Sequence, residues 1–248
     1  MTIDRAIDVL ATRESILVFT GAGISTESGI PDFRGPDGVW TRVDPSEFTI
    51  DRYLSNADTR RRSWTMRQES GLLEASPNDG HRAIADLWQT GRMIGCVTQN
   101  IDGLHAAAGL PPESIVELHG NARTTSCVEC GSTTPTADVV SRVVAGEADP
   151  RCSCGGILKV DVVFFGERMP AAAMTRAMAW AAACDSVVSV GSTLSVYPAS
   201  YVPLTAAEAG APLVIINQGS TDLDRVATVV VAESSGATLR TIVDALID

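Results

Sequence analysis

The chain has 248 residues with 19 basic and 30 acidic side chains, so its formal net charge is −11 and its pI is near 4.7. This length allows one large domain with a small satellite, and a hydrophobic content of 45% is enough to fill a core. The acidic balance argues against a nucleic-acid binder, because such proteins cluster Lys and Arg against phosphates. A basic polypeptide fits this charge better as a partner.

Neither a membrane span nor a disulfide scaffold is indicated. No run approaches the roughly 20 apolar residues that a span requires, and the N-terminal sequence lacks a basic stretch followed by an apolar one. We therefore expect a cytoplasmic protein without a membrane partner. The six cysteines are too few for a disulfide scaffold, and four of them form two close pairs, which suggests a metal in a reducing compartment.

Short apolar runs rich in β-branched residues predict buried strands. These runs are residues 16–19, 93–97, 115–118, 186–190, 213–216 and 226–231. Beside them, apolar residues three or four positions apart predict amphipathic helices, for example from Ile3 to Leu10 and from Leu239 to Leu246. Strands alternating with helices indicate an α/β fold, a doubly wound parallel sheet that binds ligands at the carboxyl ends of its strands.

Two stretches interrupt this alternation. Residues 36–78 are polar and predict a helical insertion, while residues 123–157 carry the paired cysteines around a short helical piece at 137–145. We expect both stretches to form a second, smaller domain. The sheet domain would then comprise residues 1–35, 79–122 and 158–248.

A glycine-rich turn follows the first predicted strand. In Gly21-Ala22-Gly23-Ile24-Ser25, two glycines let the backbone approach a phosphate and expose N–H groups toward it. The motif alone is weak, because many tight turns share it. The third glycine of the dehydrogenase fingerprint is replaced by Thr26, and no acidic residue stands where a ribose clamp is expected, so hydride transfer is disfavoured.

Polar side chains follow two further strands. Gln99, Asn100 and Asp102 come directly after the second strand, where amide and carboxylate groups can hold sugar hydroxyls and carboxamide edges. His119 follows another strand, and imidazole is the side chain best suited to move a proton near neutral pH. A histidine taken alone is more often structural, and we expect His81 to start a helix and His105 to support a loop.

Four cysteines have the spacing of a metal site. The pairs C-x2-C and C-x-C supply the four thiolates of a closed tetrahedral zinc site, which would stabilise a small domain and perform no chemistry. The alternative is two pairs of free or redox-active cysteines. The residues are Cys127, Cys130, Cys152 and Cys154.

Five sequence motifs and the cysteine pairs together resemble the sirtuins, the NAD-dependent protein lysine deacylases, and in particular the bacterial type. The motifs are GAGISTESGIPDFRG from residue 21, TQNIDGLH from 98, HG at 119, VVFFGE from 162 and GSTLSVYPA from 191. They match in order and spacing, and the resemblance runs from about residue 16 to the C-terminus. Residues 43–76 are covered least.

The resemblance implies a Rossmann-like NAD-binding domain, a smaller zinc-binding and helical domain, NAD as co-substrate and one structural zinc ion per chain. The order Gly-Ser-Thr at 191–193 replaces the family's usual Gly-Thr-Ser, which leaves open which hydroxyl contacts the cofactor. The implied cofactor-binding residues are Gly21, Ala22, Gly23, Ser25, Asp32, Phe33, Arg34, Gln99, Asn100, Asp102, Gly191, Ser192, Thr193 and Asn217.

The same resemblance implies a catalytic group of His119, Asn100 and Asp102, with the imidazole as base toward a ribose hydroxyl. The substrates would be acylated lysines of proteins or peptides, and the products nicotinamide, O-acyl-ADP-ribose and free lysine. The implied substrate-binding residues are Val163, Phe165, Gly166, Glu167 and Val196. Glu167, in an acidic protein, would suit lysine-rich targets, unless it is an ordinary solvated charge.

Several alternatives stay open. Sirtuins that prefer acidic acyl groups carry Tyr-x-x-Arg in the insertion, and here Trp64 precedes an Arg67 that could pair with a succinyl carboxylate. We favour instead a surface arginine run with residues 60–62, and acetyl or a longer neutral group as the acyl group. The same site could also transfer ADP-ribose to protein. A pure NAD-binding module has no need of His119, and the charge argues against a zinc-dependent nucleic-acid binder.

Overall fold

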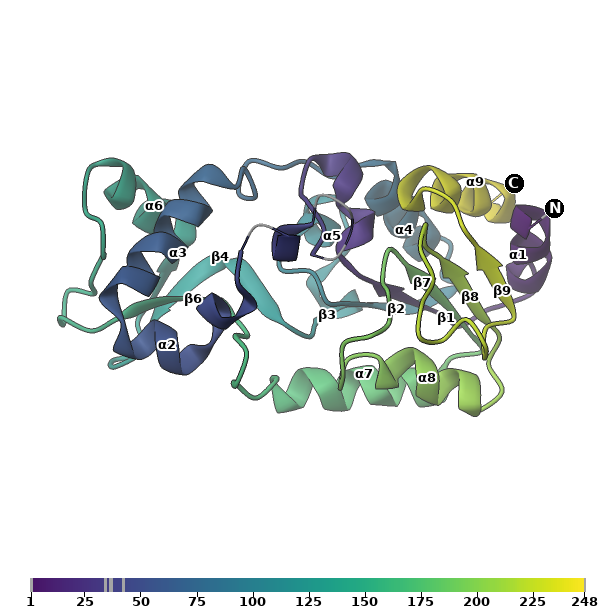
Figure 1. The fold of residues 1–248 in the computed structure, drawn as a ribbon. Helices are drawn as coiled ribbons and strands as arrows, with labels where there is room; N and C mark the ends of the chain where they lie inside the picture. Colours follow the sequence, from purple (N-terminus) through teal and green to yellow (C-terminus); the bar gives the residue numbers. More distant parts are fainter. Residues whose placement is uncertain (1, 34, 36–37, 42, 248) are drawn as a thin grey trace.

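The computed structural model describes residues 2–33, 35, 38–41 and 43–247. It contains two regions side by side, each built around its own sheet (Figure 1). The two chain termini lie close together on the larger region (Figure 1). Within the described residues, every helix falls short of the length and apolar character needed to span a bilayer.

The larger region is built on a six-stranded sheet whose paired strands are all parallel. The strand order β3-β2-β1-β7-β8-β9 reverses direction between β1 and β7, and open sheets bind ligands at such a reversal. The predicted doubly wound sheet is thereby confirmed. Its strands are β1 (Ile16–Thr20), β2 (Met93–Thr98), β3 (Ile115–Glu117), β7 (Ser186–Val190), β8 (Leu213–Ile216) and β9 (Val229–Val231).

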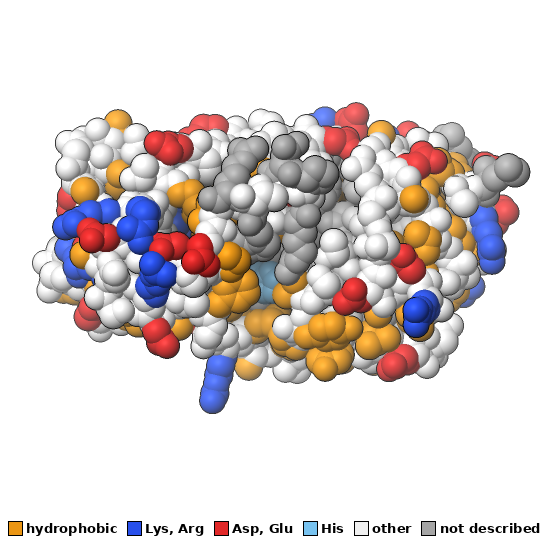
Figure 2. Space-filling view, in the orientation of Figure 1, with side chains coloured by type: hydrophobic (Ala, Val, Ile, Leu, Met, Phe, Trp, Pro, Cys, Tyr) orange, Lys and Arg blue, Asp and Glu red, His pale blue; other side chains and the backbone are white. Residues whose placement is uncertain are grey.

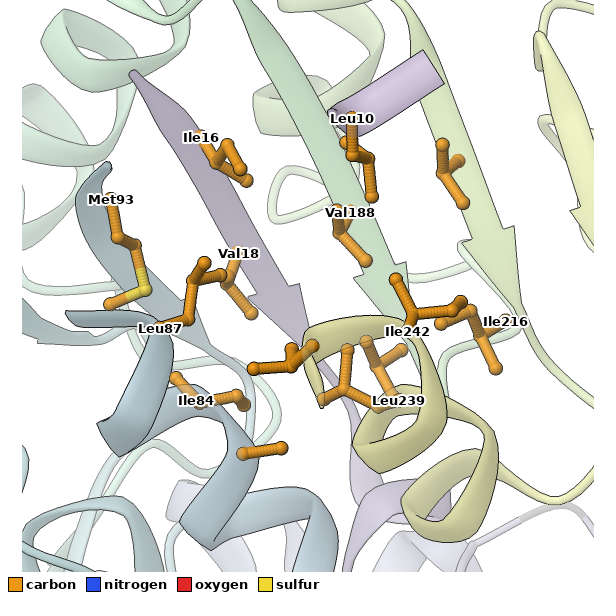
Figure 3. Close-up of a cluster of buried hydrophobic side chains, with 14 of the residues drawn as sticks. Leu10, Ile16, Val18, Ile84, Leu87, Met93, Val188, Ile216, Leu239 and Ile242 are labelled. Carbon is orange, nitrogen blue, oxygen red and sulfur yellow. The ribbon is translucent and has the colours of Figure 1, made fainter. Parts of the chain in front are cut away.

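Helices cover both faces of this sheet, with α1, α4 and α9 on one side and α7 and α8 on the other (Figure 1). Alternate residues of a strand point to opposite faces, so Val18 and Val188 pack under Ile84, Leu239 and Ile242 on the first face (Figure 3). Burying each such side chain contributes about 1.5–3 kcal/mol. The helices are α1 (Thr2–Leu10), α4 (Asp79–Gln89), α7 (Ala171–Ala183), α8 (Tyr201–Glu208) and α9 (Ser235–Ile247).

Short helical turns complete the connections between these elements. The α-helical turn α5 (Leu104–Ala107) follows β2. The 3-10 turns are η1 (Ala22–Ile24), η2 (Thr26–Ser28), η3 (Val39–Thr41), η4 (Pro45–Phe48) and η5 (Pro112–Ser114).

The smaller region has an antiparallel sheet of order β5-β4-β6, covered by three helices. The sequence assigned residues 158–162 to the larger domain, whereas the structure places them beside β4 as β6. The reason is packing, because Leu158 and Val160 share a core with Tyr53 and Trp64. The elements are α2 (Ile50–Ser55), α3 (Ala57–Glu69), β4 (Gly120–Cys127), β5 (Thr133–Pro135), α6 (Thr136–Val144) and β6 (Leu158–Val162).

The predicted surface run of arginines is wrong for Arg60. This side chain is only 4% exposed, and its guanidinium pairs with Asp149 at 2.9 Å while also donating to the carbonyls of Tyr53 and Leu54. Arg60 therefore ties α3 to the chain that leads into the second cysteine pair. Arg61 and Arg62 are exposed, as the sequence suggested.

Candidate active site

Two loops meet where the strand order reverses, one after β1 and one after β7. The N–H of Gly21 donates to Val190 O at 3.0 Å, and the N–H of Gly23 donates to Gly191 O at 2.8 Å. A Cβ atom on Gly21 would lie 2.7 Å from Gly191 O, and one on Gly23 would lie 2.7 Å from Gly191 Cα. Both glycines are thus required for the close approach of the two loops, and Ala22 stands half-buried between them.

Three buried polar side chains converge beside this junction. The hydroxyl of Ser25 donates to Asp102 Oδ2 at 2.8 Å, and Asn100 Nδ2 donates both to Ser25 Oγ at 3.2 Å and to Gly21 O at 3.1 Å. The other carboxylate oxygen of Asp102 accepts the N–H of Leu104 at 2.9 Å. These bonds fix the loop after β1 to the loop after β2, because Ser25 is 75 residues from Asn100 and 77 residues from Asp102 in the sequence.

The end of β2 is also tied to the end of β7. Gln99 Nε2 donates to Ser192 Oγ at 2.8 Å, whereas the Thr193 hydroxyl pairs with that of Ser195 at 2.8 Å. The two neighbouring hydroxyls of this motif thus have different surroundings, and Ser192 is the one brought to Gln99. Asn217, after β8, is half-buried and donates to Gly219 O.

The loop after η2 carries three predicted cofactor residues. Asp32 Oδ1 accepts the N–H of Gly35 at 2.7 Å. The carboxylate of Asp32 therefore stabilises the turn that starts at this residue. Phe33 is exposed. Arg34 lies outside the described residues.

His119 is the one histidine of the chain that is not buried. Its Nδ1 lies 2.9 Å from the carbonyl oxygen of Gln99. A carbonyl only accepts, so Nδ1 carries the proton and Nε2 keeps a free lone pair. Burial lowers the pKa of His119, and the Gln99 hydrogen bond opposes this only in part. The geometry suits a neutral base.

The other two histidines are buried and contact hydroxyl groups of Thr20 and Ser25. His105 Nε2 lies 2.8 Å from the Thr20 hydroxyl, and His81 Nε2 lies 3.5 Å from Ser25 Oγ. Burial lowers the pKa of His81 to about 3 and that of His105 to about 4, so both are neutral. His81 also forms a capping box with Asn78 at the start of α4, the helix start that the sequence predicted.

Hydrophobic side chains gather on both sides of a hollow, and histidine surface is visible at its floor (Figure 2). The predicted substrate segment follows β6, where the N–H of Val163 donates to His119 O at 2.8 Å. Phe165 is 51% exposed, and its backbone pairs with Phe48 and Ile50. Val196, in the loop after β7, is half-buried.

Glu167 is the last residue of the predicted substrate segment after β6, and its charge is paired. Its carboxylate lies 3.0 Å from Lys159 Nζ and accepts the N–H of Phe164. Lys159 was not among the predicted site residues, although its being the single lysine of the chain is a signal that the sequence offers.

Arg67 is half-buried and is not part of an exposed arginine run. Its guanidinium donates to Ser63 and lies 5.8 Å from the ring centre of Trp64. Burial lowers the pKa of Arg67. Within the described residues no carboxylate contacts it.

The four paired cysteines come together at the end of the smaller sheet. Their Sγ atoms all lie within 4.8 Å of one another, with 3.6 Å between Cys127 and Cys154 and 3.7 Å between Cys130 and Cys152. A tetrahedral zinc ion with Zn–S bonds of about 2.3 Å sets its sulfurs about 3.8 Å apart. The cluster fits a structural zinc site that leaves no open position.

Comparison with known proteins gives consistent matches. The model of the Sir2 family matches residues 21–198. "NAD-dependent protein deacetylase 2" of Streptomyces coelicolor is 45% identical over 227 residues, which cover 90% of this chain and 94% of that protein.

Two solved structures are similar over nearly the whole chain. A Sir2 with a p53 peptide and NAD+ has a TM-score of 0.87 and 33% identity, and covers 98% of each chain. A Sir2 variant with a deacetylated p53 peptide and 3′-O-acetyl ADP ribose has a TM-score of 0.91 and 33% identity, again over 98% of each chain.

Proposed function

The chain belongs to the Sir2 family, and from that premise we propose that it is an NAD-dependent protein lysine deacylase that acts mainly on acetyl-lysine. The observation that carries the proposal is the Nδ1 hydrogen bond of His119 to Gln99 O, which leaves Nε2 free to act as a base. The relative from Streptomyces coelicolor is named a deacetylase and covers 90% of this chain, which supports acetyl as the acyl group.

NAD is the co-substrate, and when bound it supplies the ribose that receives the acyl group and the nicotinamide that leaves. We assign its phosphates to the loop with Gly21, Ala22 and Gly23, because this loop lies at the carboxyl end of β1 beside the strand reversal, where open α/β sheets bind ligands. We assign Ser192, Thr193 and Asn217 to the adenosine half. Asp32, Phe33 and Arg34 belong to the covering loop in this proposal.

The residues around the nicotinamide ribose do two things. Both Asn100 and Asp102 bond to Ser25, Asn100 also donates to Gly21 O, and Asp102 also accepts the N–H of Leu104. They can therefore orient a ligand without moving, which lowers the cost of alignment. His119 Nε2 then accepts a proton from a ribose hydroxyl. Its lowered pKa keeps it in the neutral form that this step requires.

We assign the acylated lysine to Val163, Phe165 and Val196, the substrate-binding residues that the family resemblance implies. An apolar wall selects a neutral acyl-lysine over a charged lysine, because burying an unpaired ammonium is costly. Gly166 and Glu167 complete the flank along which an extended peptide can add as a strand. Acylated proteins are the proposed partners, and a cytoplasmic location, whose reducing conditions keep the four thiols available, stays our expectation.

Product analysis tests this function. An acetylated peptide incubated with the chain and NAD should lose its acetyl group in proportion to nicotinamide released, and the acetyl group should appear on ADP-ribose. Retention of ADP-ribose on the acceptor protein would instead show transfer. A succinylated peptide in parallel tests the desuccinylase alternative, and a faster rate on that peptide would displace acetyl as the main group and point to Arg67.

A further inference from the structure

We infer that Lys159 is a positioning residue for the acylated peptide, because it fixes residues 162–167, the flank on which the peptide is proposed to bind. This inference rests on the proposed function. Lys159 is the single lysine among the 19 basic residues of the chain, whereas the other 18 are arginine. It lies on β6, one strand position from the core residues Leu158 and Val160.

Three oxygen atoms surround the ammonium group. Lys159 Nζ lies 3.0 Å from Glu167 Oε2, donates to Val162 O at 2.7 Å and lies 3.4 Å from Val160 O. Its side chain is only 13% exposed, and its charge stands 4.8 Å from the ring centre of Phe164. An ammonium has three donors, so this arrangement satisfies the group and holds it in one place.

Glu167 lies at the C-terminal end of the segment 162–167, and its contacts hold that end in place. The Oε2 atom that meets Lys159 also accepts the N–H of Phe164 at 2.7 Å, and the N–H of Glu167 donates to Phe164 O at 3.0 Å. The chain passes between them through Gly166 with φ 88°, a left-handed conformation that favours glycine. Lys159 and Glu167 together therefore close a turn whose two ends are held by one ion pair.

The fixed segment is joined directly to the proposed base. Val162 pairs with Gly120 in the small sheet, and the N–H of Val163 donates to the carbonyl of His119. On the other side, Phe165 bonds through its backbone to Phe48 and Ile50. Without the contacts of Lys159, residues 162–167 would lose their register against the β4 side and against residues 48–50. The peptide strand that adds to it would then bind less tightly.

The ion pair also limits which features of the substrate peptide residues 162–167 can recognise. Because Lys159 neutralises Glu167, that carboxylate does not select basic side chains of the substrate. Recognition then depends on the peptide backbone and on apolar contact with Phe165, which predicts a loose sequence preference.

Four variants test the inference: K159M, K159R, E167Q and the double variant K159M/E167Q. We expect K159M and E167Q each to raise the KM for an acetylated peptide roughly tenfold, which corresponds to about 1.4 kcal/mol. The KM for NAD and the zinc content should stay at the wild-type values. K159R keeps the charge and should restore most of the peptide affinity. The double variant should be no worse than either single one, because the two residues act as one unit.

An unchanged peptide KM in K159M, or a K159R variant as impaired as K159M, would overturn the inference. Comparable rises in the KM for peptide and in the KM for NAD, together with a loss of zinc, would mean general damage and would overturn it too. If K159M fails to fold, E167Q carries the same test from the other partner. A wild-type chain without any deacylation refutes the proposed function, whereas an active wild type with unaffected variants refutes only this inference.

Chemical labelling gives an independent readout, because a lysine-directed N-hydroxysuccinimide acetate can modify only one lysine side chain here. We expect Lys159 to react more slowly than free lysine, and more slowly still when an acetylated peptide and NAD are bound. Mass spectrometry of the peptide that contains Lys159 measures both rates. Labelling as fast as free lysine, unaffected by the substrates, would contradict a held ammonium group.

Discussion

The two regions of the molecule reach stability by different means. In the six-stranded sheet, β1 buries all five of its residues, and apolar clusters lie on both faces. In the smaller sheet, β4 is rich in Thr and Ser, and the core beneath it has nine buried residues among those the structure describes. The smaller region adds a four-thiolate cluster and a buried ion pair. Where apolar burial is scarce, polar and metal bonds must take its place.

Metal removal should produce the largest difference between the regions. Chelation would remove the zinc ion that links the four cysteines, so the smaller region should unfold while the six-stranded sheet stays folded. Hydrogen exchange followed by mass spectrometry reads the two regions separately. About one zinc per chain is expected before chelation. A smaller region that stays protected in a metal-free chain would contradict the structural role of the site.

A truncation in the large core comes next. Ile216 lies on β8 and is fully buried in the core under α9. Ile216→Ala should lower the free energy of unfolding by about 2–5 kcal/mol through lost burial and a residual cavity. Urea denaturation measures the loss. The control is Val128→Ala, because Val128 is exposed and its truncation should change little. Equal losses in both variants would show that the large region does not depend on its core.

Breaking the buried ion pair should weaken the smaller region by about 3 kcal/mol. Arg60→Met leaves Asp149 with Arg151 as its remaining partner at 3.0 Å. The matched control is Arg61→Met, since Arg61 is exposed and its ion pair with Asp58 contributes under about 1 kcal/mol. Denaturation of the zinc-loaded protein compares the two. Indistinguishable losses would mean that burial of Arg60 has no energetic consequence.

Acid should act on the same pair. Partial burial raises the pKa of Asp149, but hydrogen bonds and charge from Arg60 and Arg151 outweigh this and lower the pKa overall. A carboxylate with a lowered pKa stabilises the fold above its unfolded value of about 3.9, and this contribution is lost as the pH falls through the folded pKa. Arg60→Met should therefore flatten the loss of stability below pH 4. An identical acid slope in both proteins would argue against the pair.

The smallest effect concerns His119, at the junction of the regions. Burial lowers its pKa, so the acid limb of kcat/KM should lie below the ordinary histidine value of about 6.5. The same shift means that protonating His119 costs stability as the pH falls below that value. A pH profile with an acetylated peptide measures the limb. A midpoint above 6.5 would mean that burial does not control this group.

The large sheet could be predicted from the sequence because its strands are apolar runs rich in β-branched residues. The smaller sheet could not, since β4 reads Gly-Asn-Ala-Arg-Thr-Thr-Ser-Cys and buries only one face. The alternation of β6 was visible, but its partner was not.

The motifs of the site were visible in the sequence, and their mutual contacts were not. Gln99 and Ser192 are 93 residues apart, and only the fold brings them to 2.8 Å. The burial of Arg60 was equally hidden, because an arginine run has the same composition whether it faces solvent or a carboxylate. Likewise, the Lys159–Glu167 pair depends on a turn that composition does not specify.

The most direct test of the account is the variant His119→Ala, measured for NAD binding and for turnover of an acetylated peptide. Removing a positioned base should reduce kcat by about 10²–10⁴-fold. NAD affinity should change little, because Ser25, Asn100 and Asp102 are held by their own bonds. A variant that binds NAD and turns over at the wild-type rate would contradict the assignment of His119 as the base.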